Sequence, residues 1–138
     1  MKTRTLFLFV ALLLSVSGSK VYANKFIEFY KDGIYYYISG KDKKEKVAVV
    51  YHRPNNLSTL YSGMVVIPEK VKYKGKTYPV TMIGSSAFKD CVKLKEVVIP
   101  NSVTVIDSYA FSGCTGLKNI KIPNSVTSIG WRVFSGCI

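Results

Sequence analysis

The side chains with the widest range of possible reactions in this 138-residue chain are three cysteines, Cys91, Cys114 and Cys137. They lie at equal intervals of 23 residues (114 − 91 and 137 − 114). Thiols form disulfides, bind metals and act as nucleophiles. Zinc ligands usually cluster, as in two cysteines separated by about two to four residues. The much wider interval between these cysteines therefore disfavours a metal site, and we expect none.

Groups for acid–base catalysis are sparse. His52 is the only histidine, and it lies beside Arg53 with no acid close to it in the sequence. The eight carboxylates are dispersed, and no spacing pairs them as general acid and base: Glu28, Asp32, Asp42, Glu45, Glu69, Asp90, Glu96 and Asp107. The segment 112–116 has two glycines but lacks the Gly-Lys-Ser/Thr of a phosphate-binding loop. We predict no catalytic residue, no cofactor and no enzyme.

The cysteines close a nine-residue motif, Ile-x-x-x-Ala/Val-Phe-x-x-Cys, which occurs at 83–91, 106–114 and 129–137. A second motif, Leu-x-x-Val/Ile-x-Ile-Pro-Asn-Ser-Val, occurs at 94–103 and 117–126. Repeats at a fixed interval of about 20 to 50 residues are typical of a solenoid, in which each coil buries its apolar side against the next. The sequence therefore predicts a β-rich solenoid.

The best copy of the repeat predicts the structure of one coil. Alternation over 94–99 indicates a short strand of a parallel ladder, with its apolar residues inward. Pro100 ends that strand because proline donates no hydrogen bond, and 108–111 is compatible with one helical turn. Each coil thus combines a short parallel strand with a short helical turn. We expect the equivalent phenylalanines to form one inward column: Phe88, Phe111 and Phe134.

The combined motif resembles the BspA-type leucine-rich repeat of bacterial surface and secreted proteins. Its I-P-x-S-V and A-F-x-x-C portions carry the resemblance, which covers residues 79–138. The resemblance implies a leucine-rich-repeat fold in a secreted or cell-surface protein. It also implies binding to a protein or glycan ligand, with a role in adhesion to a host or its matrix.

Stacked coils give the cysteines two interpretations. They form either a ladder of free, buried thiols or a disulfide between neighbouring coils. Neighbouring coils would place the cysteine Cα atoms about 4.8 Å apart, which permits a disulfide, but parallel side chains rarely reach the torsion that a disulfide requires. We favour the ladder, and the disulfide stays open.

Residues 1–23 are typical of a cleavable signal peptide. Lys2 and Arg4 precede an apolar run over 6–16 that is too short to span a bilayer, and Ala23 is the small residue expected before cleavage. The alternative is an anchor that stays attached. We expect an exported protein that begins near Asn24 and has no further membrane segment.

The rest of the chain divides into a cap and a solenoid. Residues 24–61 contain aromatic and β-branched runs, which predict an antiparallel β meander that covers the end of the first coil. Residues 62–138 form the solenoid, with a weak first coil at 62–79 and 23-residue repeats at 80–138. Nine extra residues in the first coil predict an inserted hairpin at 72–80.

The charge is basic but scattered. Removal of the signal peptide takes away three cations and lowers the formal net charge from +12 to +9 (12 − 3). Of the seventeen remaining cations only Arg53 and Arg132 are arginine. Nucleic-acid sites favour arginine and a clustered footprint, so we expect no nucleic-acid partner.

Side chains that project outward from the ladder are the candidate ligand-binding residues. The alternation selects Glu96 and Val98 in one coil and Asn119 and Lys121 in the next. Tyr73 and Tyr78 on the inserted hairpin are further candidates, although many of the tyrosines are ordinary sheet residues. Protein or glycan ligands both stay open.

The last coil suggests a second kind of contact. Its next inward leucine would fall at position 140 (117 + 23), beyond residue 138. Trp131 and Val133 replace the smaller Ser108 and Ala110 of the preceding coil. We therefore expect these two residues to support self-association as a homodimer. The alternative is that the chain is a truncated member of a longer repeat array.

Overall fold

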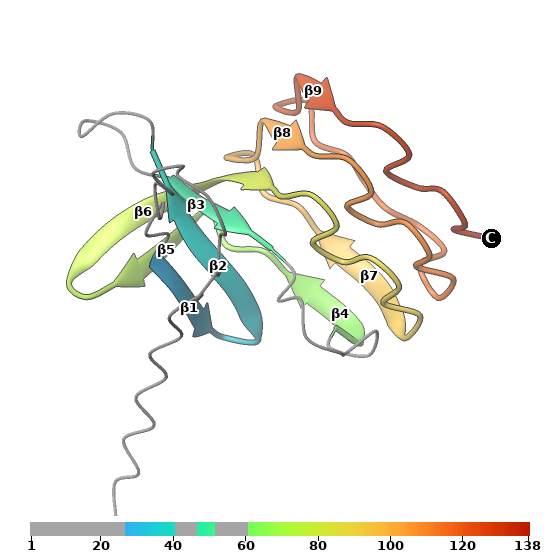
Figure 1. Cartoon of the computed structure of the whole chain (residues 1–138), viewed down its shortest axis with the longest axis horizontal. Helices are drawn as coiled ribbons and strands as arrows, with labels where there is room; N and C mark the ends of the chain where they lie inside the picture. Colours follow the sequence, from blue (N-terminus) through green and yellow to red (C-terminus); the bar gives the residue numbers. More distant parts are fainter. Residues whose placement is uncertain (1–26, 41–46, 52–60) are drawn as a thin grey trace, which may run out of the picture.

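The computed structural model describes residues 27–40, 47–51 and 61–138. The expected signal peptide at 1–23 and His52 lie outside these residues. The described part forms nine strands and no helix (Figure 1): β1 (Ile27–Lys31), β2 (Ile34–Ser39), β3 (Val47–Val50), β4 (Gly63–Val66), β5 (Lys70–Tyr73), β6 (Lys76–Ile83), β7 (Leu94–Val98), β8 (Val105–Ile106) and β9 (Ser128–Ile129). None of its segments is a helix long and apolar enough to cross a membrane.

The N-terminal strands form the antiparallel meander that their composition predicts. A tight turn with positive φ at Asp32 and Gly33 joins β1 to β2, as two-residue hairpins require. β2 pairs with β3, and its alternating residues Ile34, Tyr36 and Ile38 are buried. β3 then pairs in parallel with β6. The meander therefore also lengthens the sheet of the coils, in the order β1-β2-β3-β6-β8-β9.

A hairpin of β5 and β6 projects from the first coil at the site of the extra residues. Its turn, Lys74-Gly75, has positive φ at both positions, and the register pairs Tyr73 with Lys76. The far end of β6 enters the coil ladder, where Met82 pairs with Val105 of β8. One strand thus connects the hairpin to the repeats.

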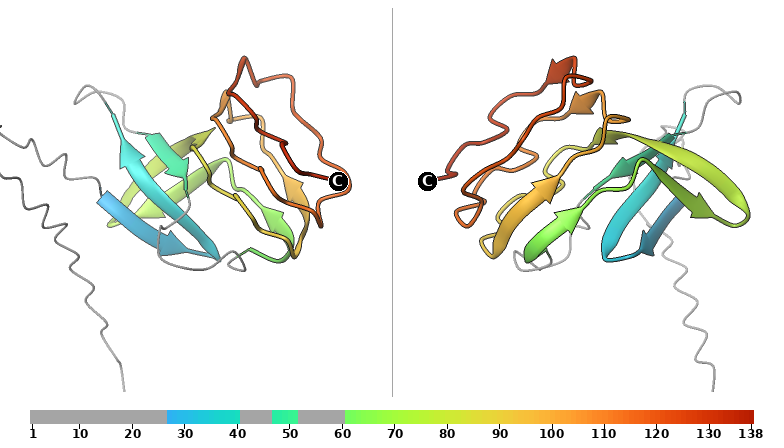
Figure 2. Two further views of the ribbon diagram at one scale, coloured as in Figure 1. Left: turned by 45° about the vertical axis from the view of Figure 1, so that its right-hand side comes forward. Right: turned by 180° about the vertical axis from the view of Figure 1, so that it is seen from behind.

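The coils stack as two short parallel ladders. One ladder pairs β4 with β7, and the other runs from β6 through β8 to β9. Figure 2 shows the successive coils side by side. Between the ladders the three phenylalanine rings are stacked, with centroids 5.1 Å apart for Phe88 and Phe111 and 5.7 Å apart for Phe111 and Phe134. The expected phenylalanine column is confirmed.

The column has a fourth ring that the repeated interval does not reveal. The buried ring of Tyr61 packs on Phe88 at a centroid distance of 4.7 Å, although the separation of these two residues (88 − 61) exceeds that interval (111 − 88). The Tyr61 hydroxyl accepts a hydrogen bond from the Tyr35 amide at 3.1 Å and donates to the Tyr51 carbonyl at 3.4 Å. Tyr61 therefore fastens the meander to the first coil.

The expected helical turn does not form in any described coil. Residues 85–90, 108–113 and 131–136 are instead successive reverse turns, with positive φ at Ser86, Asp90, Tyr109 and Arg132 among others. Along these turns, backbone amides donate alternately within their own coil and to the next coil. The Ala87 amide donates to the Gly84 carbonyl of its own coil, whereas the Phe88 amide donates to the Ala110 carbonyl of the next coil. A helix would use every amide within its own coil, so the stacking of coils excludes it.

The cysteines form the ladder and no disulfide. All three are free thiols. Sγ of Cys114 donates to the Phe88 carbonyl at 3.0 Å, and Sγ of Cys137 donates to the Phe111 carbonyl at 3.0 Å. Each of these thiols therefore ties its coil to the preceding one.

Candidate ligand-binding face

The strand β7 separates an apolar side from a polar side. Leu94, Val97 and Ile99 are buried in the core. Glu96 is exposed between them, and Val98 keeps 41% of its surface exposed. Alternation holds from Val97 to Ile99, whereas Lys95 and Glu96 are both exposed between the buried Leu94 and Val97, next to a shift in the register with β4. The expected strict alternation over 94–99 is therefore wrong at its start, and the exposed side chains still face solvent above the buried apolar residues.

The next coil continues the same surface without strand pairing. Asn119 and Lys121 are exposed, whereas Ile120 and Ile122 are half-buried against the core. Among the described residues, no backbone hydrogen bond joins the segment 118–122 to β7.

Contacts at both ends hold this unpaired segment in place. A Cβ at Gly116 would collide with the carbonyl oxygens of Val92 and Leu94, so the chain approaches closely there because that residue is glycine. At the other end Ser125 Oγ donates to the Val103 carbonyl at 2.8 Å.

An open hollow of about 1180 Å³ lies over these two segments. Its polar lining combines amides, ammonium groups and one carboxylate: Lys95, Glu96, Asn101, Asn119, Lys121 and Asn124. We call this surface the ladder face. Such groups donate and accept hydrogen bonds over a broad area, as interfaces with macromolecules do. No cluster of histidine, cysteine or carboxylate side chains that could hold a metal is present in the described part of the chain.

A family model described as "BspA type Leucine rich repeat region (6 copies)" matches residues 81–138. These residues belong to the BspA-type leucine-rich repeat family. The match confirms the resemblance that the repeated motifs carry. The family is generally non-enzymatic and consists of modules for protein interaction.

Solved leucine-rich repeat structures are similar to most of this chain. One, from Bacteroides ovatus, is 36% identical with a TM-score of 0.64, and the match covers 79% of this chain and 27% of that one. A leucine rich cell surface protein of Faecalibacterium prausnitzii is 27% identical with a TM-score of 0.62, over 80% of this chain and 28% of that one.

A third structure, a leucine-rich repeat protein of T. pallidum, is 28% identical with a TM-score of 0.60, over 80% of this chain and 46% of that one. This chain thus spans 27% to 46% of the lengths of these three proteins. A comparison with curated proteins gave no match.

The ladder face unites four of the residues selected from the repeat pattern. Glu96, Val98, Asn119 and Lys121 all line the hollow. Sequence reasoning omitted Asn101 and Asn124, which also line it. These two asparagines occupy equivalent positions after the proline of each leucine-rich repeat, and that equivalence was the available signal.

The hairpin tyrosines lie elsewhere. Tyr73 is half-buried and its ring stacks on Phe29 at 4.4 Å. Tyr78 is only 8% exposed and packs in the core, so it offers no ligand-binding surface. Tyr78 pairs with Val71 on the inner face of the hairpin, because the hairpin curls against β1, and strand alternation alone does not reveal which face curls inward.

The two candidate residues for self-association in the last repeat differ in their exposure to solvent. Trp131 is 65% exposed, and the guanidinium of Arg132 lies 4.4 Å from its ring centroid. Val133 is only 3% exposed, because it occupies the inward position of Ala87 and Ala110. Val133 therefore belongs to the core of the repeats and cannot itself contact a second copy, which corrects the expectation for this residue.

Proposed function

We propose that this chain is the repeat region of an exported, non-enzymatic binding protein that holds a protein ligand on its ladder face. The observation that carries the proposal is the hollow, in which polar side chains of two successive coils face solvent over a buried apolar frame. The family and the cell-surface protein of F. prausnitzii support a location at the cell surface. Adhesion to a host matrix is the role that the family resemblance implies.

A protein ligand fits the lining better than a glycan. The hollow contains no aromatic ring, and it is the apolar face of such a ring on which a sugar would pack. Its mixture of amides, lysines and one carboxylate instead matches the peptide groups and charged side chains of another protein.

Charge exchange on the ladder face tests this proposal. The double variant Glu96→Lys with Lys121→Glu keeps the net charge and alters two exposed side chains, so the fold should persist. We expect binding to a panel of purified extracellular-matrix proteins to fall by about tenfold or more in surface plasmon resonance.

The matched control is Glu28→Lys with Lys89→Glu, which exchanges exposed charges away from the ladder face and should leave binding unchanged. Equal loss in both variants would contradict the proposal. Binding to no matrix protein, together with glycan-array binding that Glu96→Lys with Lys121→Glu abolishes, would replace the protein ligand of the ladder face by a glycan.

A second candidate function is self-association through the last described coil. Ile129, Trp131 and Phe134 expose apolar surface there, and among the described residues the amides of Arg132 and Gly136 donate no backbone hydrogen bond. Exposed apolar area and unpaired amides favour association. Light scattering at micromolar concentration should show a dimer that Trp131→Glu dissociates, and a monomer in both would exclude this function.

A further inference from the structure

The hairpin of β5 and β6 carries a concentration of positive charge, and it is an insertion that the repeat itself lacks. Four of the seven residues at 70–76 are lysine, and none is acidic. The segment overlaps the nine extra residues of the first coil, since 12 steps separate Val71 from Ile83 (83 − 71) where the next coil has three (106 − 103). Insertions of this kind in repeat proteins often carry binding functions.

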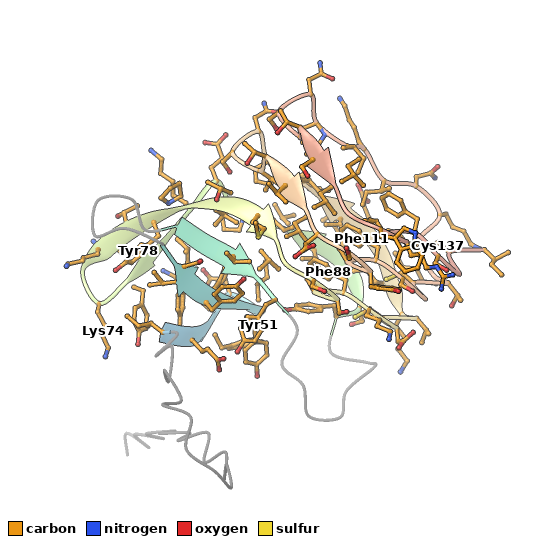
Figure 3. The ribbon with its side chains drawn as sticks, turned by 45° about the horizontal axis from the view of Figure 1, so that its top comes forward. Tyr51, Lys74, Tyr78, Phe88, Phe111 and Cys137 are labelled. Carbon is orange, nitrogen blue, oxygen red and sulfur yellow. The ribbon has the colours of Figure 1, made fainter. Side chains whose placement is uncertain are left out.

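The register places these lysines on the surface. Lys70 pairs with Pro79 and Lys72 with Thr77, so both face outward, while Val71 between them is buried. Alternate residues of a strand are about 7 Å apart. Lys74 continues the row into the turn, and Figure 3 shows it at the tip of the hairpin, far from the phenylalanine column. Lys76 on the returning strand is also exposed, but it pairs with Tyr73 and therefore projects from the face opposite to Lys70 and Lys72.

Contacts with β1 support the hairpin from below. The ring of Tyr73 stacks on Phe29 at a centroid distance of 4.4 Å and an interplanar angle of 19°. Lys31 Nζ donates to the Lys72 carbonyl at 3.4 Å and brings a fifth ammonium group to the hairpin. The row of charges is therefore held on a braced element, which lowers the entropy cost of binding.

These charges are not neutralised within the described part of the chain. None of the hairpin ammonium groups forms an ion pair there, and the contacts that they do make are with a carbonyl for Lys31 and with the ring of Tyr73, 5.4 Å away, for Lys74. A row of unpaired ammonium groups raises the local concentration of anions and attracts a polyanion.

We infer that this hairpin binds a linear acidic polysaccharide, whose carboxylate or sulfate groups contact the ammonium groups of Lys70, Lys72 and Lys74. A membrane surface fits less well, because residues 70–77 expose no aliphatic or fully accessible aromatic side chain that would enter the lipid interface. Single-stranded nucleic acid also fits less well, because the half-buried ring of Tyr73 already stacks on Phe29 and has Lys74 Nζ 5.4 Å from its centroid, whereas bases need accessible aromatic rings on which to stack.

Removal of the hairpin charges tests the inference. In the triple variant Lys70→Gln, Lys72→Gln and Lys74→Gln, we expect binding to immobilised heparin or to polygalacturonate to weaken by about tenfold or more, since three exposed charge contacts are lost. Heparin probes sulfate recognition and polygalacturonate probes carboxylate recognition. Binding of the unaltered chain should decrease as salt increases, and neutral dextran should not bind.

The matched control carries the same loss of charge elsewhere, in Lys89→Gln, Lys93→Gln and Lys118→Gln, three exposed positions outside the hairpin. It should retain binding, and circular dichroism should show both variants folded. Equal weakening of the two triple variants would overturn the inference, because net charge alone would then explain binding. Binding to phosphatidylglycerol vesicles or to an oligonucleotide in place of both polysaccharides would also overturn it.

The proposed protein site on the ladder face and the inferred polysaccharide site on the hairpin can be tested separately. The variant Glu96→Lys with Lys121→Glu should bind the polysaccharides as the unaltered chain does, because the ladder face and the hairpin lie on different strands. Loss of polysaccharide binding in that variant would contradict a hairpin site, whereas loss of protein binding alone concerns only the ladder face.

Discussion

The cysteines show how a reactive side chain becomes part of a core. Burial raises the pKa of the Cys114 thiol to about 12, and the neighbouring Cys91 adds to the effect. Burial raises the pKa of Cys91 and Cys137 as well. A thiol with a raised pKa is rarely a thiolate and is therefore a poor nucleophile. Cys114 and Cys137 thus tie neighbouring coils together, whereas Cys91 Sγ donates to the Lys89 carbonyl of its own coil.

The raised pKa of Cys114 predicts a loss of stability in alkali. The folded state keeps this thiol protonated up to about pH 12, whereas the unfolded state releases the proton from about pH 9. Its contribution to the free energy of unfolding is therefore complete below pH 9 and falls by about 1.4 kcal/mol per pH unit above it. Urea unfolding at pH 7.5 and 10.5 should show this decrease.

Cys114→Ala provides the comparison for that measurement. The variant should be less stable at pH 7.5 but should lose less stability on the way to pH 10.5. Burial also raises the pKa of Tyr36 and Tyr61, so some alkaline loss persists in both proteins. Identical losses in the two would show that Cys114 does not titrate as described.

At the scale of elements, the reverse turns and the phenylalanine column hold the coils in register. Phe111 has a stacked ring on each side, whereas Phe134 has one. Phe111 is fully buried, and Phe134 keeps 37% of its surface exposed. The same residue type at equivalent positions therefore contributes unequally.

This difference predicts unequal costs for two identical substitutions. Phe111→Ala should lower the free energy of unfolding by about 3–5 kcal/mol, because it leaves a cavity within the column. Phe134→Ala should cost about 1–2 kcal/mol, because less apolar area is withdrawn from water there. Thermal or urea unfolding of both variants measures the two costs, and equal costs would contradict the arrangement of the column.

The sequence predicts elements well where an interval repeats and poorly where it does not. The repeated interval identifies the phenylalanine column and the outward positions Glu96 and Lys121, because equivalent positions of stacked coils share one environment. The repeated interval does not reveal that Tyr61 belongs to the column, because the separation of Tyr61 from Phe88 differs from that interval. The prediction of a helical turn at 108–111 is wrong. These residues tolerate both a helical turn and successive reverse turns, and the hydrogen bonds to a neighbouring coil decide between the two conformations.

At the scale of the whole molecule, the chain presents two surfaces on separate elements. The ladder face spans β7 and the following coil, and the charged hairpin projects from the other end of the described part (Figure 1). Strand alternation could place residues on faces but could not show that the hairpin curls against β1, because that contact joins Phe29 and Tyr73, which are far apart in the sequence. Tyr78 is buried for the same reason.

The ladder face exists only if equivalent residues of successive coils lie over one another, and backbone hydrogen exchange measured by NMR tests this most directly. The amides of Phe88 and Phe111, which donate to carbonyls of the next coil, should exchange slowly. The amide of Phe134, which has no such acceptor in the described coils, should exchange fast. Equally fast exchange at all three positions, with the strands β2 and β6 still protected, would contradict the stacking of the coils and the ladder face with it.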